Sequence, residues 1–444
     1  MPRHNMMIFS SGIYMPNRRT FLKNAAAAAG FPMIVKSSVL GLQGAVPPSD
    51  RVNIATIGVG WMGGGHVDEF LRLQAAHYVV VCDIDKNHLA EAKAKIDKKY
   101  GNKDCLTFHK FEEVIVRKDI DAVSMACPDH WHGLVSVAAL KAGKDVYGEK
   151  PLAHNFHEGL MIVKAVAKGN RIWQTGSWQR SRPNFRRAVE LVRNGRIGKI
   201  KRVEVGLPGG HTDFAKTKDK TAFTPAPPEL DYDRWLGPAP VVPYCEARVH
   251  KNWRWNLAFG GGQLMDWVGH HVDIAHWGMD WDSTGPHEIE GVGEYPPKDA
   301  LWNTATKYRI SAKYPGGVEF IIAGGHRDIR GGTKWIGEEG WVWVDRSGLE
   351  ASSESILKSE IKASEVQIPK SPGHYQEFIE SVRSRKETLT PARVAIRSAT
   401  PGWLGQIAML TQRKLQWDPV KQRIVNDKDA AKLLSRNMRA PWKL

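Results

Sequence analysis

The feature that most constrains the fold is a glycine-rich turn between an apolar strand and a helix, in "VNIATIGVGWMGGGHVDEFL". The turn contains Gly58, Gly60 and Gly63. The first glycine allows the tight turn, the second lets backbone approach a pyrophosphate, and the third lets the helix pack closely on the strand. Free N–H groups at the helix N-terminus then face the anion. The pattern predicts a dinucleotide-binding unit, in which Trp61 and Met62 also contact the cofactor.

A second apolar run, "HYVVVCDID", ends at Asp83, about as far beyond the glycines as such a unit requires. A carboxylate at this strand end accepts hydrogen bonds from the adenosine ribose hydroxyls and repels a 2′-phosphate. The expected cofactor is therefore NAD(H) rather than NADP(H).

Strand-like and helix-like segments alternate up to about residue 176. Apolar strands are predicted in "DAVSMACP", "KDVYGEKP" and "RIWQTG", with helices over 131–141 and 155–168. This alternation predicts an α/β fold with a parallel, doubly wound sheet, which binds ligands at its carboxyl edge. Pro128, Glu149 and Lys150 lie at or just past predicted strand ends, so we expect them in the cofactor site.

The segments "CPDHWHG" and "AGKDVYGEKPLA", taken with the glycine turn and Asp83, resemble the Gfo/Idh/MocA family of oxidoreductases. Glu149-Lys150-Pro151 is the most specific local mark, and Cys127 departs from the Thr that many relatives have before the proline. The resemblance covers nearly the whole chain after residue 46. It implies an N-terminal Rossmann domain and a C-terminal α+β domain with a large, open, mostly antiparallel sheet, and it places His132 near the nicotinamide.

Lys150 has the chemistry that an alcohol needs beside a nicotinamide. An ammonium at a strand's carboxyl end can bind the alcohol oxygen, and its charge favours an alkoxide-like transition state. Glu149 is expected to hold or tune this lysine. Pro151 is a candidate for a cis peptide bond that aims it, because X-Pro bonds allow that isomer.

A second candidate segment is "GGGQLMDWVGHHVDIAHW", which predicts a helix over 262–277. The i, i+4 spacing puts Asp266 and His270 on one helical face. By the resemblance, His270 is the general base, Asp266 binds substrate or orients the site, and Lys150 completes the trio. Histidine suits proton transfer because its unperturbed pKa of about 6.5 lies near working pH.

A metal site is the alternative for this segment, with Asp266, His270, Asp273 or His276 as ligands. Such a site explains neither the glycine turn nor Lys150, so no metal is predicted, and His271, Asp273 and His276 are interpreted as ordinary helix residues.

Further substrate contacts are assigned to three residues, each with a structural alternative. Arg180 in "GSWQRS" could reach the site or be a surface residue. Trp253 and Trp255 in "HKNWRW" could form the wall of a sugar pocket or pack the sheet.

The N-terminus resembles a Tat export signal. Arg18 and Arg19 precede Phe-Leu-Lys and a short alanine-rich apolar stretch, so the Tat machinery is an expected partner and the periplasm the expected location. The cleavage site is left open. The predicted division is signal and linker over 1–46, Rossmann domain over 47–176, substrate and oligomerisation domain over 177–384, and a terminal helix and tail over 385–444.

The net charge of +16 is spread along the chain without a long Lys/Arg run, which favours a generally basic surface over a nucleic-acid groove. No apolar run outside the N-terminus has the length of a membrane span. The expected partners are a small carbohydrate and, by the resemblance, further copies of the chain in a dimer or tetramer.

Three functions compete on these observations. The first is a dehydrogenase acting on a secondary alcohol of a sugar, glycoside or cyclitol. Because Tat carries folded proteins and free NAD is not expected outside the cytoplasm, its cofactor is predicted to be tightly bound. The second is an NAD-dependent glycosidase that works by transient oxidation, elimination and re-reduction. Some relatives work in this way but often lack the Glu-Lys-Pro tripeptide. The third is a sugar-binding protein without activity.

Overall fold

The computed structural model describes residues 46–444, so the predicted Tat signal lies outside the described residues. Met1–Asp50 is a unit separate from Arg51–Leu444. The described part of the first unit contains one short 3-10 turn, Pro48–Asp50. Among residues 46–444, none of the helices combines the length and apolar character that crossing a membrane requires.

The first sheet is parallel and contains six strands in the order β3-β2-β1-β4-β5-β6. Its central strands are apolar and almost fully buried, as expected for strands covered on both faces. The strands are β1 (Val52–Ile57), β2 (Ala76–Cys82), β3 (Leu106–Phe108), β4 (Ala122–Met125), β5 (Asp145–Gly148) and β6 (Trp173–Thr175).

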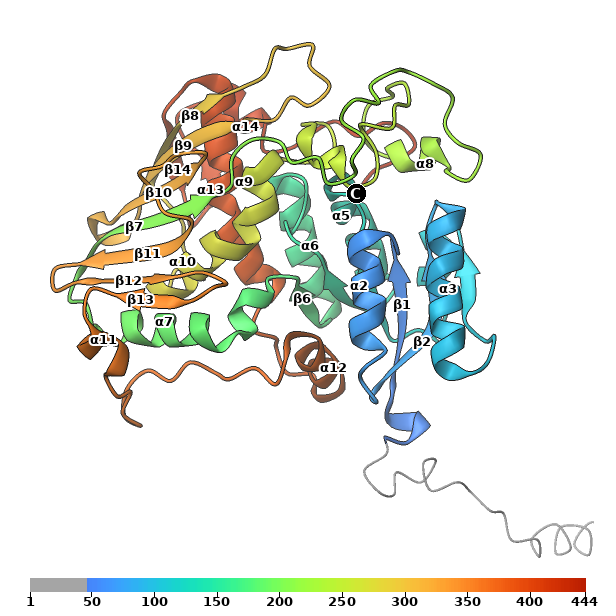
Figure 1. The fold of residues 1–444 in the computed structure, drawn as a ribbon, viewed down its shortest axis with the longest axis horizontal. Coiled ribbons are helices and arrows are strands. Elements are labelled where there is room, and N and C mark those ends of the chain that lie inside the picture. The colour runs from blue at the N-terminus through green and yellow to red at the C-terminus, as the bar shows by residue number, and fades with distance from the viewer. Residues whose placement is uncertain (1–45) are drawn as a thin grey trace, which may run out of the picture. The chain divides into compact units, whose positions relative to one another are not determined.

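Helices connect these strands by crossovers. They are α2 (Trp61–Phe70), α3 (Lys86–Tyr100), α4 (Phe111–Ile115), α5 (Asp129–Lys141) and α6 (Phe156–Gly169). Because the strand order reverses at β1, right-handed crossovers place α2 and α3 on one face and α5 and α6 on the other (Figure 1). The reversal opens a crevice at the carboxyl ends of β1 and β4, where doubly wound sheets bind ligands.

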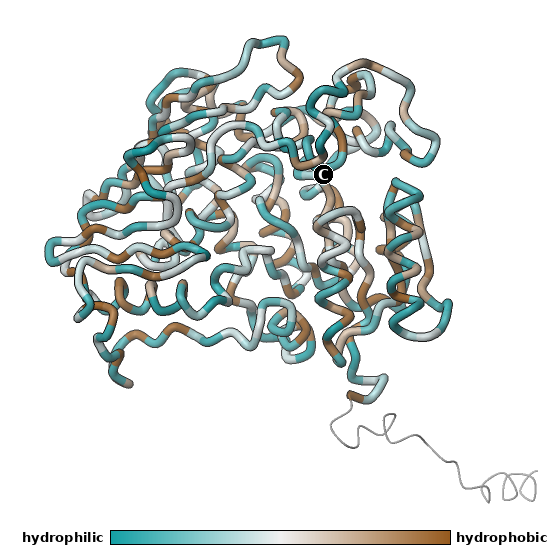
Figure 2. The backbone as a smooth tube through the Cα atoms, in the orientation of Figure 1, coloured by the Kyte–Doolittle hydropathy of each residue, from teal (hydrophilic) through white to brown (hydrophobic). Residues whose placement is uncertain are grey.

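The second sheet has nine strands in the order β13-β12-β11-β7-β10-β9-β8-β14-β15, and all neighbours are antiparallel except β7 and β10. Burial alternates along β9, which gives the sheet one covered face and one exposed face. Apolar and hydrophilic residues interleave along these strands (Figure 2). The strands are β7 (Ile200–Leu207), β8 (Glu288–Glu294), β9 (Lys307–Lys313), β10 (Glu319–Gly324), β11 (Gly332–Gly337), β12 (Trp341–Val344), β13 (Leu349–Ala351), β14 (Leu415–Asp418) and β15 (Arg423–Ile424).

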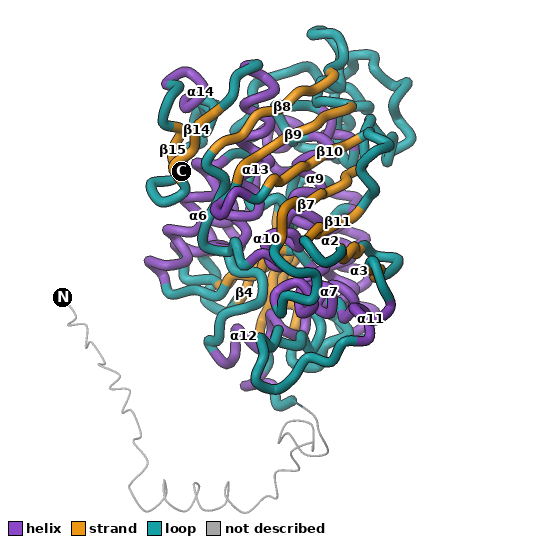
Figure 3. Tube along the Cα trace, turned by 90° about the vertical axis from the view of Figure 1, so that its left-hand side faces the viewer, coloured by secondary structure: helices purple, strands orange, loops and turns teal. Residues whose placement is uncertain are grey.

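Helices pack on the covered face of this sheet, behind the strands in Figure 3. Together the two sheets confirm the predicted Rossmann domain and the mostly antiparallel second domain. The remaining helical segments are η3 (Trp178–Ser181), α7 (Pro183–Arg193), α8 (Tyr232–Leu236), η4 (Asn252–Trp255), α9 (Gly262–Trp267), η5 (Val268–Val272), α10 (Asp273–Met279), η6 (Pro315–Gly317), α11 (Glu354–Lys358), α12 (His374–Ser384), α13 (Ala392–Thr411) and α14 (Lys428–Lys432).

The C-terminal tail packs against the first domain. Arg436 forms a 2.7 Å ion pair with the buried carboxylate of Glu158 on α6. The ring of Trp442 lies edge-on to Trp131 of α5, with 4.8 Å between centroids. These contacts join the last residues of the chain to helices that flank the parallel sheet.

Candidate active site

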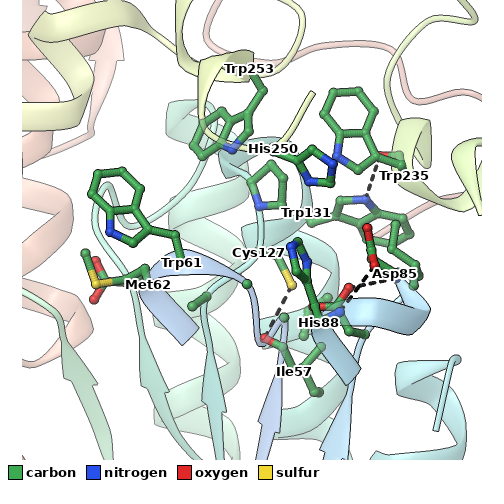
Figure 4. A pocket seen from close by; sticks show the side chains of 18 of the residues that line it. Ile57, Trp61, Met62, Asp85, His88, Cys127, Trp131, Trp235, His250 and Trp253 are labelled. Carbon is green, nitrogen blue, oxygen red and sulfur yellow. Dashed lines mark hydrogen bonds and ion pairs between the residues drawn. The ribbon is translucent and has the colours of Figure 1, made fainter. Parts of the chain in front are cut away.

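A pocket lies at the carboxyl edge of the parallel sheet and is lined by the glycine turn, the ends of β2, β4 and β5, and a loop from the second half of the chain (Figure 4). Its shape requires the glycines. Gly58 has a φ of +79°, and a Cβ there would lie 2.9 Å from the oxygen of Ala126. A Cβ on Gly63 would lie 1.8 Å from the oxygen of Gly58. The residues present therefore fit a dinucleotide whose pyrophosphate approaches bare backbone. Gly60, Trp61 and Met62 line the same pocket.

Asp83 lies at the end of β2, where the ribose of such a cofactor is expected. Its two carboxylate oxygens accept the N–H groups of Val59 (2.7 Å) and Asp85 (2.8 Å). Burial raises the pKa of Asp83, and these N–H groups and nearby His88 act in the opposite direction. The backbone thus holds the carboxylate in one orientation beside the glycine turn.

Two histidines that the sequence analysis did not identify also line this pocket. His88 lies in the first turn of α3, and His250 comes from the loop that precedes η4. The two rings are in edge contact, with 5.2 Å between their centroids. One ring nitrogen of each histidine and a carboxylate oxygen of Asp85 lie within 4.8 Å of one another. The long loop of the second domain therefore closes against the Rossmann domain over the cofactor pocket.

Lys150 lines the pocket and forms an ion pair with Asp266, which does not itself line it. The Lys150 ammonium donates to the backbone oxygen of Asp266 at 2.8 Å and to its carboxylate at 2.9 Å. Arg254 donates to the same carboxylate oxygen at 3.0 Å. Burial alone would raise the pKa of Asp266, but the two cations hold it far below its usual range. Asp266 is thus an ionised anchor for Lys150, and Arg254 is a member of the site that sequence reasoning missed.

The helix that carries Asp266 and His270 is not continuous, and this corrects the prediction of one helix over 262–277. A π-helical turn, η5, separates α9 from α10. The wide turn brings Gly269 against Lys150, and a Cβ on that glycine would lie 2.7 Å from Cβ of the lysine. Inserted π turns often occur at functional sites. Here the turn gives the lysine its position beside the helix.

His270 lies within this turn and is 5% exposed. Its Nδ1 atom is buried without a hydrogen-bond partner among the described residues. Burial, followed by the positive charges of Lys150 and Arg346, lowers the pKa of His270 well below its usual value. The imidazole is therefore neutral near pH 7 and can accept a proton.

The remaining predicted cofactor-site residues form no ion pair with Lys150 or Asp266. Glu149 binds His66 of α2 at 3.0 Å and accepts the backbone N–H of Lys150, so its contact with the lysine is through the backbone and not through the ammonium. His132 directs its two ring nitrogens at the backbone oxygens of Pro151 and Cys127. Pro128 precedes α5 and lines the pocket, and the Lys150–Pro151 bond is cis as predicted.

Two predicted substrate contacts are wrong. Arg180 is 2% exposed, and its guanidinium is occupied by Asp273 (2.7 Å) and Asp282 (2.8 Å). A buried arginine with two carboxylate partners stabilises the interior and has no donor directed at a ligand. Trp255 is fully buried, with its indole N–H bonded to the oxygen of Thr212. Trp253 does line the pocket.

The contacts of Asp273 and His276 argue against the metal site considered for the 262–277 segment. Asp273 is held by Arg180, and His276 binds the hydroxyl of Tyr314 at 2.8 Å. Both side chains are buried in the second domain, and they do not join Asp266 in a ligand set.

Solved structures with this fold cover most of the chain. An aldose-aldose oxidoreductase from Caulobacter crescentus, crystallised with glycerol, has a TM-score of 0.60 at 17% identity, with 82% of this chain and 99% of that chain covered. A scyllo-inositol dehydrogenase from Lactobacillus casei, with bound NAD(H) and scyllo-inositol, has a TM-score of 0.58 at 17% identity, with the same coverage. At this identity the likeness shows the fold alone.

Sequence relatives match over a shorter region. "Glycosyl hydrolase family 109 protein 2" of Shewanella sp. (strain ANA-3) is 34% identical over 162 residues, which are 32% of this chain and 35% of the relative. "Myo-inositol 2-dehydrogenase" of Thermotoga maritima is 29% identical over 186 residues, which are 42% of this chain and 49% of the relative. The chain therefore aligns with less than half the length of these curated relatives.

Two family models together match almost the whole chain after residue 51. Residues 52–177 match the NAD-binding Rossmann fold of the oxidoreductase family, and residues 184–444 match its C-terminal alpha/beta domain. The first match agrees with the glycine turn and Asp83, and it confirms NAD as the cofactor. The protein belongs to the Gfo/Idh/MocA family of NAD-binding oxidoreductases.

Proposed function

We propose that this protein is an NAD(H)-dependent oxidoreductase that acts on a secondary alcohol of a sugar, glycoside or cyclitol. The observation that carries the proposal is the Lys150–Asp266 contact, which joins the end of β5 to the helix bearing His270. The names of the relatives, which include inositol dehydrogenases and an aldose-aldose oxidoreductase, support the substrate class. Family membership supports a homodimer or homotetramer.

Each residue has one task in this proposal. NAD, when bound, supplies the hydride chemistry. Lys150 binds the alcohol oxygen and stabilises the negative charge that develops on it. Asp266, held ionised by Lys150 and Arg254, fixes the ammonium in place. Neutral His270 accepts the hydroxyl proton during oxidation and returns it during reduction.

The proposed location is the periplasm, reached by the Tat route as a folded protein. Free NAD is not expected there, so we further propose that the enzyme is exported with NAD bound and that oxidation and reduction alternate in one site. The loop that carries His250 and Trp253 over the pocket supports retention of the cofactor.

Bound cofactor is the first expected result. Protein purified from its native host without added nucleotide should release close to one equivalent of NAD or NADH when it is denatured, because the loop closes the pocket. Chromatography of the supernatant with NAD, NADH and NADP standards measures this amount. Full activity in protein that releases no nucleotide would contradict the retention proposal.

A second candidate is an NAD-dependent glycosidase, and the matches to glycosyl hydrolase family 109 proteins favour it. Such an enzyme cleaves a glycosidic bond without net formation of NADH. A chromogenic glycoside distinguishes the two: release of the aglycone with unchanged NAD would replace the dehydrogenase proposal, whereas accumulation of a keto-glycoside supports it.

A further inference from the structure

A cationic group lies beside His270 and is not used by the proposed chemistry. Arg346, in the turn between β12 and β13, places its guanidinium carbon 4.6 Å from the ring centroid of Trp178 and 4.5 Å from that of Trp267. The His270 ring contacts the same two indoles, with centroids 6.1 and 5.6 Å apart. Three segments that are distant in sequence, around Trp178, around Trp267 and His270, and around Arg346, thus bring this guanidinium next to the candidate base.

Arg346 has no ion-pair partner among residues 46–444. The adjacent carboxylate of Asp345 is occupied in its own turn, where one oxygen accepts hydrogen bonds from Ser347 N (2.7 Å), Ser347 Oγ (2.6 Å) and Gly348 N (3.1 Å). Arg330 shows the contrasting case. It lies over Trp343 at 3.3 Å, and both of its terminal nitrogens bind Glu350 at 2.7 Å. Arg346 is exposed, and among the described residues its N–H donors have no carboxylate partner.

Two carboxylates, Asp266 and Asp345, act on Arg346 at longer range but form no ion pair with it within residues 46–444. Arg182 also lies over Trp178, at 5.5 Å, which adds a second cation on this side of His270. Asp266 is already shared by Lys150 and Arg254. Lys150 lines the pocket and adjoins the turn that carries His270, and excess positive charge on that side favours a ligand of opposite charge.

We propose that the substrate carries a negatively charged oxygen substituent, a carboxylate or a sulfate ester, that binds Arg346. Indole contacts restrict the guanidinium plane, and its free edge matches two oxygens of one planar or tetrahedral oxyanion. The substrate class is therefore an acidic sugar or glycoside. This inference rests on the proposed function, because it places the sugar ring beside His270.

The test compares matched sugars that differ in one charge. Methyl glucoside, methyl glucuronide and methyl glucoside 6-sulfate, with the corresponding galactose series, are titrated against wild-type protein and Arg346→Gln. Turnover is followed by the fluorescence of bound NADH. Binding is followed separately by tryptophan fluorescence in a Lys150→Ala background, where a loss of chemistry does not hide the ligand. Arg330→Gln is the matched control, since it removes an arginine that stacks on tryptophan but already has a carboxylate partner.

The wild-type protein should prefer an anionic sugar over its neutral partner, and Arg346→Gln should lower this ratio by about 10- to 100-fold, as expected for a charge-assisted two-point contact. Arg346→Lys should restore part of the ratio, because lysine keeps the charge and loses the fork. Whether the glucuronide or the 6-sulfate loses its preference in Arg346→Gln shows whether the bound group is a carboxylate or a sulfate ester. An unchanged ratio in Arg346→Gln, or a wild-type protein without preference for charge, would overturn this inference alone. Arg346-dependent binding without turnover of any sugar would instead overturn the proposed function.

Discussion

Lys150→Ala should lower kcat by about 10²- to 10³-fold, the range found when one group that stabilises developing charge is removed. The physical reason is local. The ammonium lies at the end of β5, 2.9 Å from an ionised carboxylate, and its removal leaves only Arg254 on Asp266. Steady-state kinetics with the best sugar from the screen measure the loss, and circular dichroism with the melting temperature measures the fold.

The control for this variant is Lys141→Ala, an exposed lysine at the end of α5 that is remote from the Lys150–Asp266 contact. It should keep the wild-type rate. Lys150→Ala protein should also retain its NAD, because the glycine turn and Asp83 are unchanged. A Lys150→Ala rate within threefold of wild type, in folded protein with NAD bound, would show that the ammonium has no part in the chemistry.

His270→Ala should lower the rate of alcohol oxidation by about 10²- to 10⁴-fold, the usual contribution of a positioned general base. The pH profile gives an independent measurement. Burial and neighbouring cations lower the pKa of His270, so the neutral, active form predominates above the ordinary histidine pKa of about 6.5. The wild-type kcat/KM for oxidation should be level from pH 8 down through that value, and it should fall only at a pH well below it, where the imidazole becomes protonated.

His157→Ala, a substitution at an exposed histidine on α6, serves as the control and should keep both the rate and the profile. His270→Ala should lose the acid limb together with the rate. If the variant keeps the wild-type acid limb, another group titrates in the site and His270 is not the base.

Local patterns in the sequence were enough to predict the Rossmann domain. The glycine turn requires a positive φ at Gly58 and close approach of backbone at Gly58 and Gly63, and Asp83 follows at the end of the next strand. These requirements involve neighbours in sequence or one βαβ unit, so a single chain reveals them. The cofactor followed from the same residues. The second sheet was predictable in kind from the family resemblance, but its strand order was not.

The environment of the candidate site followed less well from sequence. Arg180 was expected to contact substrate, yet Asp273 and Asp282 bury its charge. Glu149 was expected to hold or tune Lys150; it accepts the backbone N–H of Lys150 and also binds His66, which is 83 residues earlier in the chain. The π turn at Val268–Val272 was not expected either, because the spacing of apolar residues is that of an ordinary helix.

The sequence by itself predicted the glycine turn and Asp83 at the end of the next strand, and the family resemblance added Lys150, Asp266 and His270. Only the tertiary structure decided which charged side chains are paired and which remain free, with Arg180 in the first group and Arg346 in the second. The physical reason is that an ion pair depends on separation in space, and the partners of Arg180 lie 93 and 102 residues away along the chain. A local sequence pattern cannot predict contacts between residues so far apart in the chain, whereas the glycine turn lies within six consecutive residues and can be recognised from them.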